Sequence, residues 1–291
     1  MSEFYVTLPS NTHVGNKTGD FRVHLPDIIK LEGEWDVALA QIQYPKSWNN
    51  ISDDSDERVG FQKNKIIVTM AADRMRLPVE IPTGHYETID DLLATIVYSI
   101  QLKAQEARDR LKPVLETDGE REKFAKVLED LNNVHARISW TFNPIIKRVQ
   151  LKFDRQLVHN IRMSRHLQYV MGFQFGDTKS FFGEKIISKY PVDVRAGLDA
   201  LYVYCDLVEN QIVGNVRAPL LKILPVQGIH GEIINQDFVA RHYVPVLSKE
   251  LQTIRISIKS DSDKMIPFEF GKVIVKLHFK RRENAYGVRA W

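Results

Sequence analysis

The chain has 291 residues, of which 44% are hydrophobic and 26% are charged, and its formal net charge is +3. With 40 basic and 37 acidic residues, the charge balance does not require a nucleic-acid or membrane partner. The single cysteine, Cys205, excludes an intrachain disulfide and a thiolate zinc site, and it fits a reducing compartment. The apolar content suffices for one embellished sandwich or two small domains.

The first residues, Met1–Phe4, have neither a basic segment nor a long apolar run, so we expect no signal peptide. The apolar runs elsewhere are far shorter than a membrane span. These features predict a soluble protein made in the cytosol, with no membrane span.

Two segments near the N-terminus, residues 21–26 and 31–45, predict strands joined by a short polar turn. The second segment has apolar side chains on both faces, with Val37 and Leu39 on one and Ala38, Ala40, Ile42 and Tyr44 on the other. A strand that is apolar on both faces has no solvent side, so it belongs inside a packed β-structure. Further strands are expected at 4–8, 66–70, 76–81, 136–142, 149–153, 200–207, 218–225, 243–247, 254–258 and 272–279. Short strands with Pro, Gly and Asn turns, and no alternation with helices, favour an antiparallel sandwich.

Residues 87–134 depart from the strand pattern and predict a pair of amphipathic helices. Thr88 with Asp91 resembles a capping box, and Pro113 ends or kinks the first helix. We expect the apolar stripes of the two helices to pack on each other and on the flank of the sandwich. The predicted domains are therefore a sandwich formed by 1–86 and 135–291, and a helical insertion at 87–134.

Motifs for catalysis, metal binding and cofactor binding do not stand out. The glycines of 172–179 lack the spacing of a phosphate loop and predict a helix end followed by a loop. His159 and His166 have no carboxylate at ligand spacing, and the acidic run 53–57 predicts a solvated loop. Cys205, in the middle of a strand, is expected to be buried and unreactive. We expect no catalytic residue, no metal site and no cofactor.

The basic clusters are modest: Lys147 with Arg148, Arg162 with Arg165, and the run 280–282. Because acidic residues nearly match basic ones, a solvated face is the default interpretation. A non-specific, salt-sensitive contact with DNA stays open as an alternative.

Short segments spread in order over nearly the whole chain carry a family resemblance. They include FYVTLPSN at 4–11, LEGEWDVALA at 31–40, HYVPV at 242–246 and PFEFGKVIVKLHF at 267–279, together with 21–26, 44–45, 84–86, 170–173, 201–206, 213–214 and 219–221. On these residues the chain resembles the minor capsid (penton) proteins of Maverick/Polinton elements. Residues 100–134 carry the least of the resemblance.

The resemblance implies an all-β fold, a single jelly-roll antiparallel β-sandwich with a helical insertion and about eight strands in two facing sheets. It implies a structural protein and no enzyme. Five copies would close a ring, a homopentamer, at each five-fold vertex of an icosahedral double-stranded DNA virus or virus-like element. The ring would meet a double-jelly-roll major capsid protein, in a virion assembled after synthesis in the host cytosol.

Ring closure needs different patches that meet around the five-fold axis. We expect them on the sandwich flanks and on two terminal arms, whose aromatic residues are Phe4, Tyr5, Tyr286 and Trp291. The strands at 21–45 and at 267–279 are expected to be neighbours in one sandwich. Two alternatives remain open: a jelly-roll module that binds carbohydrate or a receptor, and a β-sandwich hydrolase with a carboxylate pair.

Overall fold

The computed structural model describes residues 2–53, 55–56, 61–62, 64–71, 74–111, 118–173, 180–181 and 185–282. The chain divides into two compact units. Met1–Trp48 and Leu198–Trp291 form one, which we call the jelly-roll unit, and Asn49–Gly197 form the inserted unit.

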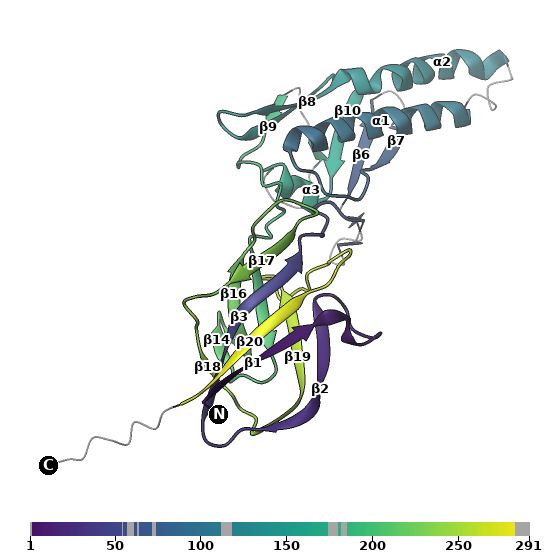
Figure 1. The fold of residues 1–291 in the computed structure, drawn as a ribbon. Coiled ribbons are helices and arrows are strands. Elements are labelled where there is room, and N and C mark those ends of the chain that lie inside the picture. The colour runs from purple at the N-terminus through teal and green to yellow at the C-terminus, as the bar shows by residue number, and fades with distance from the viewer. Residues whose placement is uncertain are drawn as a thin grey trace. The chain divides into compact units, whose positions relative to one another are not determined.

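The jelly-roll unit consists of two antiparallel sheets (Figure 1). The first has the order β1 (Glu3–Pro9), β20 (Ile274–Arg281), β3 (Trp35–Pro45) and β17 (Ile233–Asp237), and β18 (Val244–Pro245) also pairs with β3. The second has the order β16 (Leu220–Pro225), β13 (Ala200–Cys205), β19 (Glu250–Lys259) and β2 (Asp20–Lys30). A short 3-10 turn, η1 (Ser10–Thr12), follows β1.

The strand pairs identify the topology. Strand β1 pairs with β20, β2 with β19, β3 with β17, and β13 with β16. These are the pairs of one long hairpin whose tip lies between β13 and β16, and rolling that hairpin up yields two facing sheets. The tip carries a small hairpin, β14 (Gln211–Val213) with β15 (Val216–Ala218). This arrangement of eight main strands is a jelly roll, which confirms the predicted fold class.

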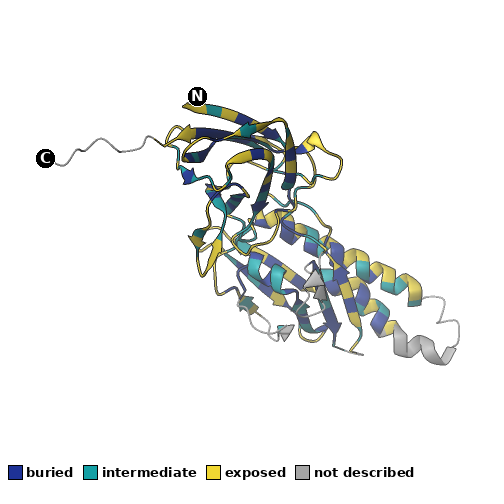
Figure 2. Ribbon diagram, turned by 90° about the horizontal axis from the view of Figure 1, so that it is seen from below, coloured by how far each residue is buried: buried dark blue, intermediate teal, exposed yellow. Residues whose placement is uncertain are grey.

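The core of the jelly-roll unit lies between the two sheets (Figure 2). Strand β3 buries one face completely, since Leu39 and Ile42 are at most 1% exposed, and Ala38 on the opposite face is also fully buried. The prediction of a strand without a solvent side is confirmed only in part. A register shift in the pairing with β20 puts Ile42 on the face of Leu39 instead of that of Ala38, and Gln41 and Gln43 on the other face are half-buried. Strands β3 and β20 are direct neighbours, with Val37 opposite Phe279, which confirms the expected pairing of the two ends of the chain.

The inserted unit combines small sheets with helices. Its strands are β4 (Ser55–Asp56), β5 (Phe61–Gln62), β6 (Lys65–Met70), β7 (Arg76–Glu80), β8 (Ile138–Asn143), β9 (Arg148–Phe153), β10 (Val158–Met163), β11 (Ser180–Phe181) and β12 (Lys185–Ile187). Its helices are α1 (Ile89–Leu111), α2 (Asp118–Asn133), the 3-10 turn η3 (Val134–Arg137) and α3 (Arg165–Val170). The sheets have the orders β11-β10-β6-β7 and β12-β9-β8, and β4 pairs with β5.

The predicted helical pair is present, and its first helix begins at the predicted capping box. The backbone N–H of Asp91 donates to Thr88 Oγ1 (3.2 Å), and the backbone N–H of Thr88 donates to Asp91 Oδ2 (3.1 Å). The apolar stripe of α1, which includes Leu92 and Ile96, is buried in the core of the inserted unit, where α1 contacts α2, β7 and β8. The helices therefore pack on each other, as expected, and on sheets of their own unit. Pro113 lies outside the described residues.

The unit boundaries differ from the expected ones. The strand pattern predicts that 49–86 and 135–197 belong to the sandwich, whereas the structure groups them with the helices. The physical reason is that strands such as 149–153 alternate between apolar and polar residues like those of the jelly roll. The alternation reveals which side chains of a strand are buried, but it does not reveal which sheet the strand joins.

Candidate functional site

The two aromatic residues predicted for the N-terminal arm, Phe4 and Tyr5, lie on opposite faces of strand β1. Successive side chains of a strand point to opposite faces. Phe4 points into the sandwich, where its ring stacks on Phe279 with centroids 4.8 Å apart and lies 5.4 Å from Trp35. Tyr5 points outward and is 49% exposed. Of the two, Tyr5 is therefore the residue that presents its ring to the surroundings.

His278 is buried beneath Tyr5 on the outer face of the first sheet. It is 2% exposed, and its ring centroid lies 4.5 Å from that of Tyr5. The Tyr243 hydroxyl lies 2.7 Å from His278 Nδ1, and Arg241 Nη1 lies 3.5 Å from the same atom. A guanidinium group can only donate, so Nδ1 is best placed to accept. That assignment puts the ring proton on Nε2, which lies 3.4 Å from Glu3 Oε2.

This environment makes stability depend on pH. Burial lowers the pKa of His278 below its usual value, and the Arg241 cation lowers it further, while Glu3 opposes the shift. Below about pH 6.5 His278 therefore binds a proton in the unfolded chain more readily than in the folded protein. We expect the free energy of unfolding to fall as the pH drops from about 6.5 through the lowered pKa, and His278→Gln to remove part of that decline.

Urea unfolding of both proteins, followed by circular dichroism between about pH 8 and about pH 5, measures the decline. His24→Gln is the matched control, since His24 is exposed on β2. An identical pH dependence in the wild type and in His278→Gln would contradict the prediction.

Two depressions open at the end of the jelly-roll unit where β20 ends. One has a volume of about 360 Å³ and is lined by Phe4, Ile29, Lys30, Leu31, Glu32, Trp35 and Arg281. The other has a volume of about 590 Å³ and is lined by Ser2, Glu3, Gly33, Glu34, Lys280, Arg281 and Arg282. The first has an apolar floor and a charged rim, whereas the second is mainly charged. Tyr286 and Trp291 follow Arg282 in the sequence and lie outside the described residues.

Strand β1 is an open edge of the first sheet, because β20 is its one partner among the described strands. The backbone N–H of Arg281 donates to the Ser2 carbonyl (2.9 Å). Since antiparallel ladders alternate, Glu3, Tyr5 and Thr7 direct their backbone groups away from β20. An open edge of this kind is a place where a strand from another chain can add.

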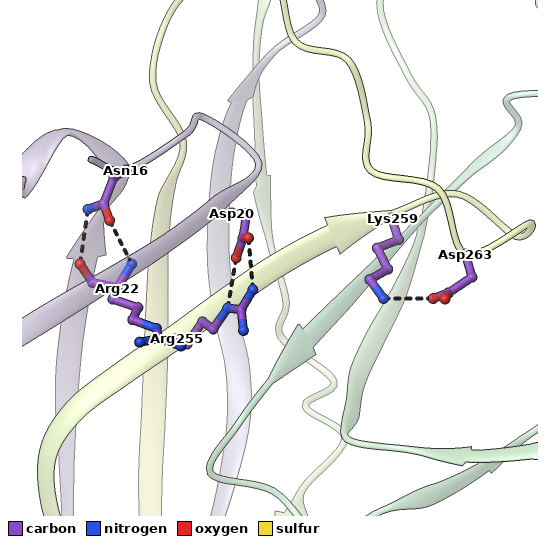
Figure 3. A network of polar contacts seen from close by, with 6 residues as sticks. All are labelled: Asn16, Asp20, Arg22, Arg255, Lys259 and Asp263. Carbon is purple, nitrogen blue, oxygen red and sulfur yellow. Dashed lines mark hydrogen bonds and ion pairs between the residues drawn. The ribbon is translucent and has the colours of Figure 1, made fainter. Parts of the chain in front are cut away.

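The second sheet carries a polar network on its outer face (Figure 3): Asn16, Asp20, Arg22, Arg255, Lys259 and Asp263. Arg255 donates two hydrogen bonds to the Asp20 carboxylate (2.9 and 2.8 Å), and these bonds lower the pKa of Asp20. The Asn16 side chain holds both backbone groups of Arg22 (3.0 and 2.9 Å). The network joins β2 to β19 and to the loop before β2. Because the Arg255–Asp20 pair is partly exposed, we expect it to stabilise the fold by at most about 1 kcal/mol.

The residues that the sequence suggested for catalysis, metal binding or phosphate binding have structural roles instead. Cys205 is fully buried, and burial raises the pKa of its thiol to about 12, which excludes a reactive thiolate. His166 Nε2 lies 2.7 Å from the Asn50 carbonyl. Gly172 has φ +75° just after α3, and a Cβ there would lie 2.2 Å from the Tyr190 carbonyl oxygen, so this glycine ends the helix as predicted.

Within the described part of the chain, His, Cys, Asp and Glu form no group of three that could hold a metal ion. The described helices include none with both the length and the apolar character needed to cross a bilayer.

The fold defines a jelly-roll protein with a large insertion between its third and fourth strands. No known family model and no curated protein matches the sequence. Among solved structures, the chain is similar to the selenomethionine-labelled mavirus penton protein, with 10% sequence identity and a TM-score of 0.46. The match covers 96% of this chain and 98% of that protein.

Proposed function

We propose that this chain is a minor capsid (penton) protein that forms the five-fold vertices of an icosahedral double-stranded DNA virus or virus-like element. The observation that carries the proposal is the rolled-hairpin topology of eight strands, in a chain whose segments resemble Maverick/Polinton penton proteins. Because a fold by itself does not define a function, the sequence resemblance is a necessary part of the argument. In this role the protein would reside in the virion and contact a double-jelly-roll major capsid protein.

The proposed ring needs two different patches on each subunit. Strand β1 offers one, because Tyr5 is exposed and the edge of the strand is open. We assign the second to the C-terminal arm with Tyr286 and Trp291. Phe4 would contribute from the floor of the apolar depression, which a neighbouring subunit would cover.

The oligomeric state tests this function. We expect mass photometry and negative-stain images of the full-length protein to show five-membered rings. Tyr5→Ser should shift ring dissociation to a roughly tenfold higher protein concentration, as expected for an interface tyrosine, and deleting 283–291 should act in the same direction.

Tyr98→Ser is the matched control, because Tyr98 is a 62% exposed tyrosine on α1 of the inserted unit. Deleting residues 1–12 would be uninformative, because it removes β1 from the first sheet. A wild type that stays monomeric both alone and with the major capsid protein would argue against the proposal, as would rings that neither change weakens.

The hydrolase alternative requires a pair of carboxylates, and Glu3 and Glu34 line the same depression. Glu34 Oε1 lies 3.1 Å from Lys249 Nζ, and Glu3 faces His278. Carboxylates held by such partners suit a structural role better than proton transfer. The penton assignment therefore stands as the proposed function.

A further inference from the structure

Strands β8 and β9 of the inserted unit form a hairpin (Figure 1). Its turn contains two exposed isoleucines. Ile145 is 89% exposed and Ile146 is 50% exposed. The Asn143 side chain accepts hydrogen bonds from the backbone N–H groups of both residues (2.9 and 3.3 Å), and Lys147 adopts φ +56°. The turn thus fixes its own conformation through local bonds, with two aliphatic side chains outside any core.

A second exposed apolar pair lies along the same sheet. Strand β12 pairs with β9, and the chain beyond it stays alongside, because Val192 N–H donates to the Lys147 carbonyl (2.9 Å). Ile187 is 48% exposed and Tyr190 is 46% exposed. Exposed apolar side chains gathered in this way mark an interaction surface rather than ordinary scatter.

The same segments are strongly basic. Residues 143–153 and 185–192 contain no Asp or Glu and five cations: Lys147, Arg148, Lys152, Lys185 and Lys189. Lys152 lies directly opposite Lys185 on neighbouring strands. Like charges in this position destabilise a sheet, and an anionic surface placed against them would relieve the repulsion. We call this surface, with the isoleucine tip, the basic hairpin face.

We propose that the basic hairpin face docks on an anionic lipid bilayer, with Ile145 and Ile146 inserted among the lipids and the cations at the headgroups. Apolar side chains beside a cluster of cations are what binding in the plane of a bilayer requires. A nucleic acid would use the cations but would gain nothing from two aliphatic side chains, since its bases stack on aromatic ones. The inference concerns the inserted unit and does not depend on the penton assignment.

Co-sedimentation of the full-length protein with vesicles tests the proposal. We expect binding to vesicles that contain phosphatidylserine and little binding to pure phosphatidylcholine. The double variant Ile145→Ser with Ile146→Ser should weaken binding about tenfold or more. Lys152→Glu with Lys185→Glu should weaken it by roughly fivefold or more for each cation removed.

Matched controls come from the jelly-roll unit. Ile212→Ser with Val216→Ser removes two exposed aliphatic residues from the β14–β15 hairpin, and Lys264→Glu with Lys272→Glu reverses two exposed cations. Both controls should bind like the wild type, and unchanged circular dichroism should show that every variant is folded. Three outcomes would overturn the proposal: no binding to anionic vesicles, equal losses in variants and controls, or binding of duplex DNA in place of vesicles with no effect of the isoleucine variant.

Discussion

Replacing Phe279 with alanine is expected to lower the free energy of unfolding of the jelly-roll unit by about 3–5 kcal/mol. Phe279 is fully buried in the middle of the first sheet, where β20 pairs with both β1 and β3. Its cross-strand partners are Phe4 and Val37, and the Phe4 ring stacks on it. Truncation would remove buried apolar area and leave a cavity that three paired strands cannot collapse to fill.

Urea unfolding followed by circular dichroism measures the loss. The matched control is Phe270→Ala, because Phe270 is 54% exposed and its truncation should cost less than about 1 kcal/mol. Similar losses in the two variants would show that the aromatic contacts of β20 do not hold the sandwich together.

The sequence specifies much of the jelly roll because the central strands of the sandwich leave a clear local trace. The stretch 35–45 is rich in apolar residues, and residues 272–279 alternate apolar with basic side chains, apart from Ile274. Both segments form strands at the predicted positions, and they pair with each other. Here the local pattern and the tertiary arrangement agree.

The extent of the insertion could not be predicted in the same way. Residues 149–153 alternate as clearly as 254–258, yet the first segment pairs with β8 and β12 in the inserted unit and the second lies in the jelly roll. Alternation specifies faces, whereas strand partners depend on where the chain returns in space. The chain enters the inserted unit at 49 without a Gly- or Pro-rich linker to mark it.

In the candidate site, one placement has a signal in the sequence and another has none. Phe4 is predicted, with Tyr5, as an aromatic residue of an interface arm, and that prediction does not use the alternation of Phe4, Val6 and Leu8, which is a signal that Phe4 faces inward. The structure places its ring on Phe279. The cluster around His278 leaves no comparable trace. Its members come from three distant segments that meet when the hairpin rolls up. In the sequence His278 is one of several basic residues that alternate along this strand, so nothing marks it as buried.

Replacing residues 49–197 with a flexible linker is expected to leave the jelly-roll unit folded. The buried residues of the two units form separate clusters, so excision removes one core and leaves the other intact. The two ends of the inserted unit lie close together, because the Asn50 side chain donates to the Val194 carbonyl (2.7 Å). A Gly/Ser linker of about ten residues, with a root-mean-square span of roughly 17 Å, should therefore connect Trp48 to Leu198.

Circular dichroism and urea unfolding of the excised protein provide the measurement, and we expect a β-type spectrum with one cooperative transition. The reciprocal control is the isolated segment 49–197, whose own core should support a second, partly helical transition. An excised protein that aggregates or unfolds without cooperativity would mean that the jelly roll needs the insertion to fold. If it folds and still forms five-membered rings, the contacts for vertex assembly belong to the jelly-roll unit, and the basic hairpin face is left free for a different partner.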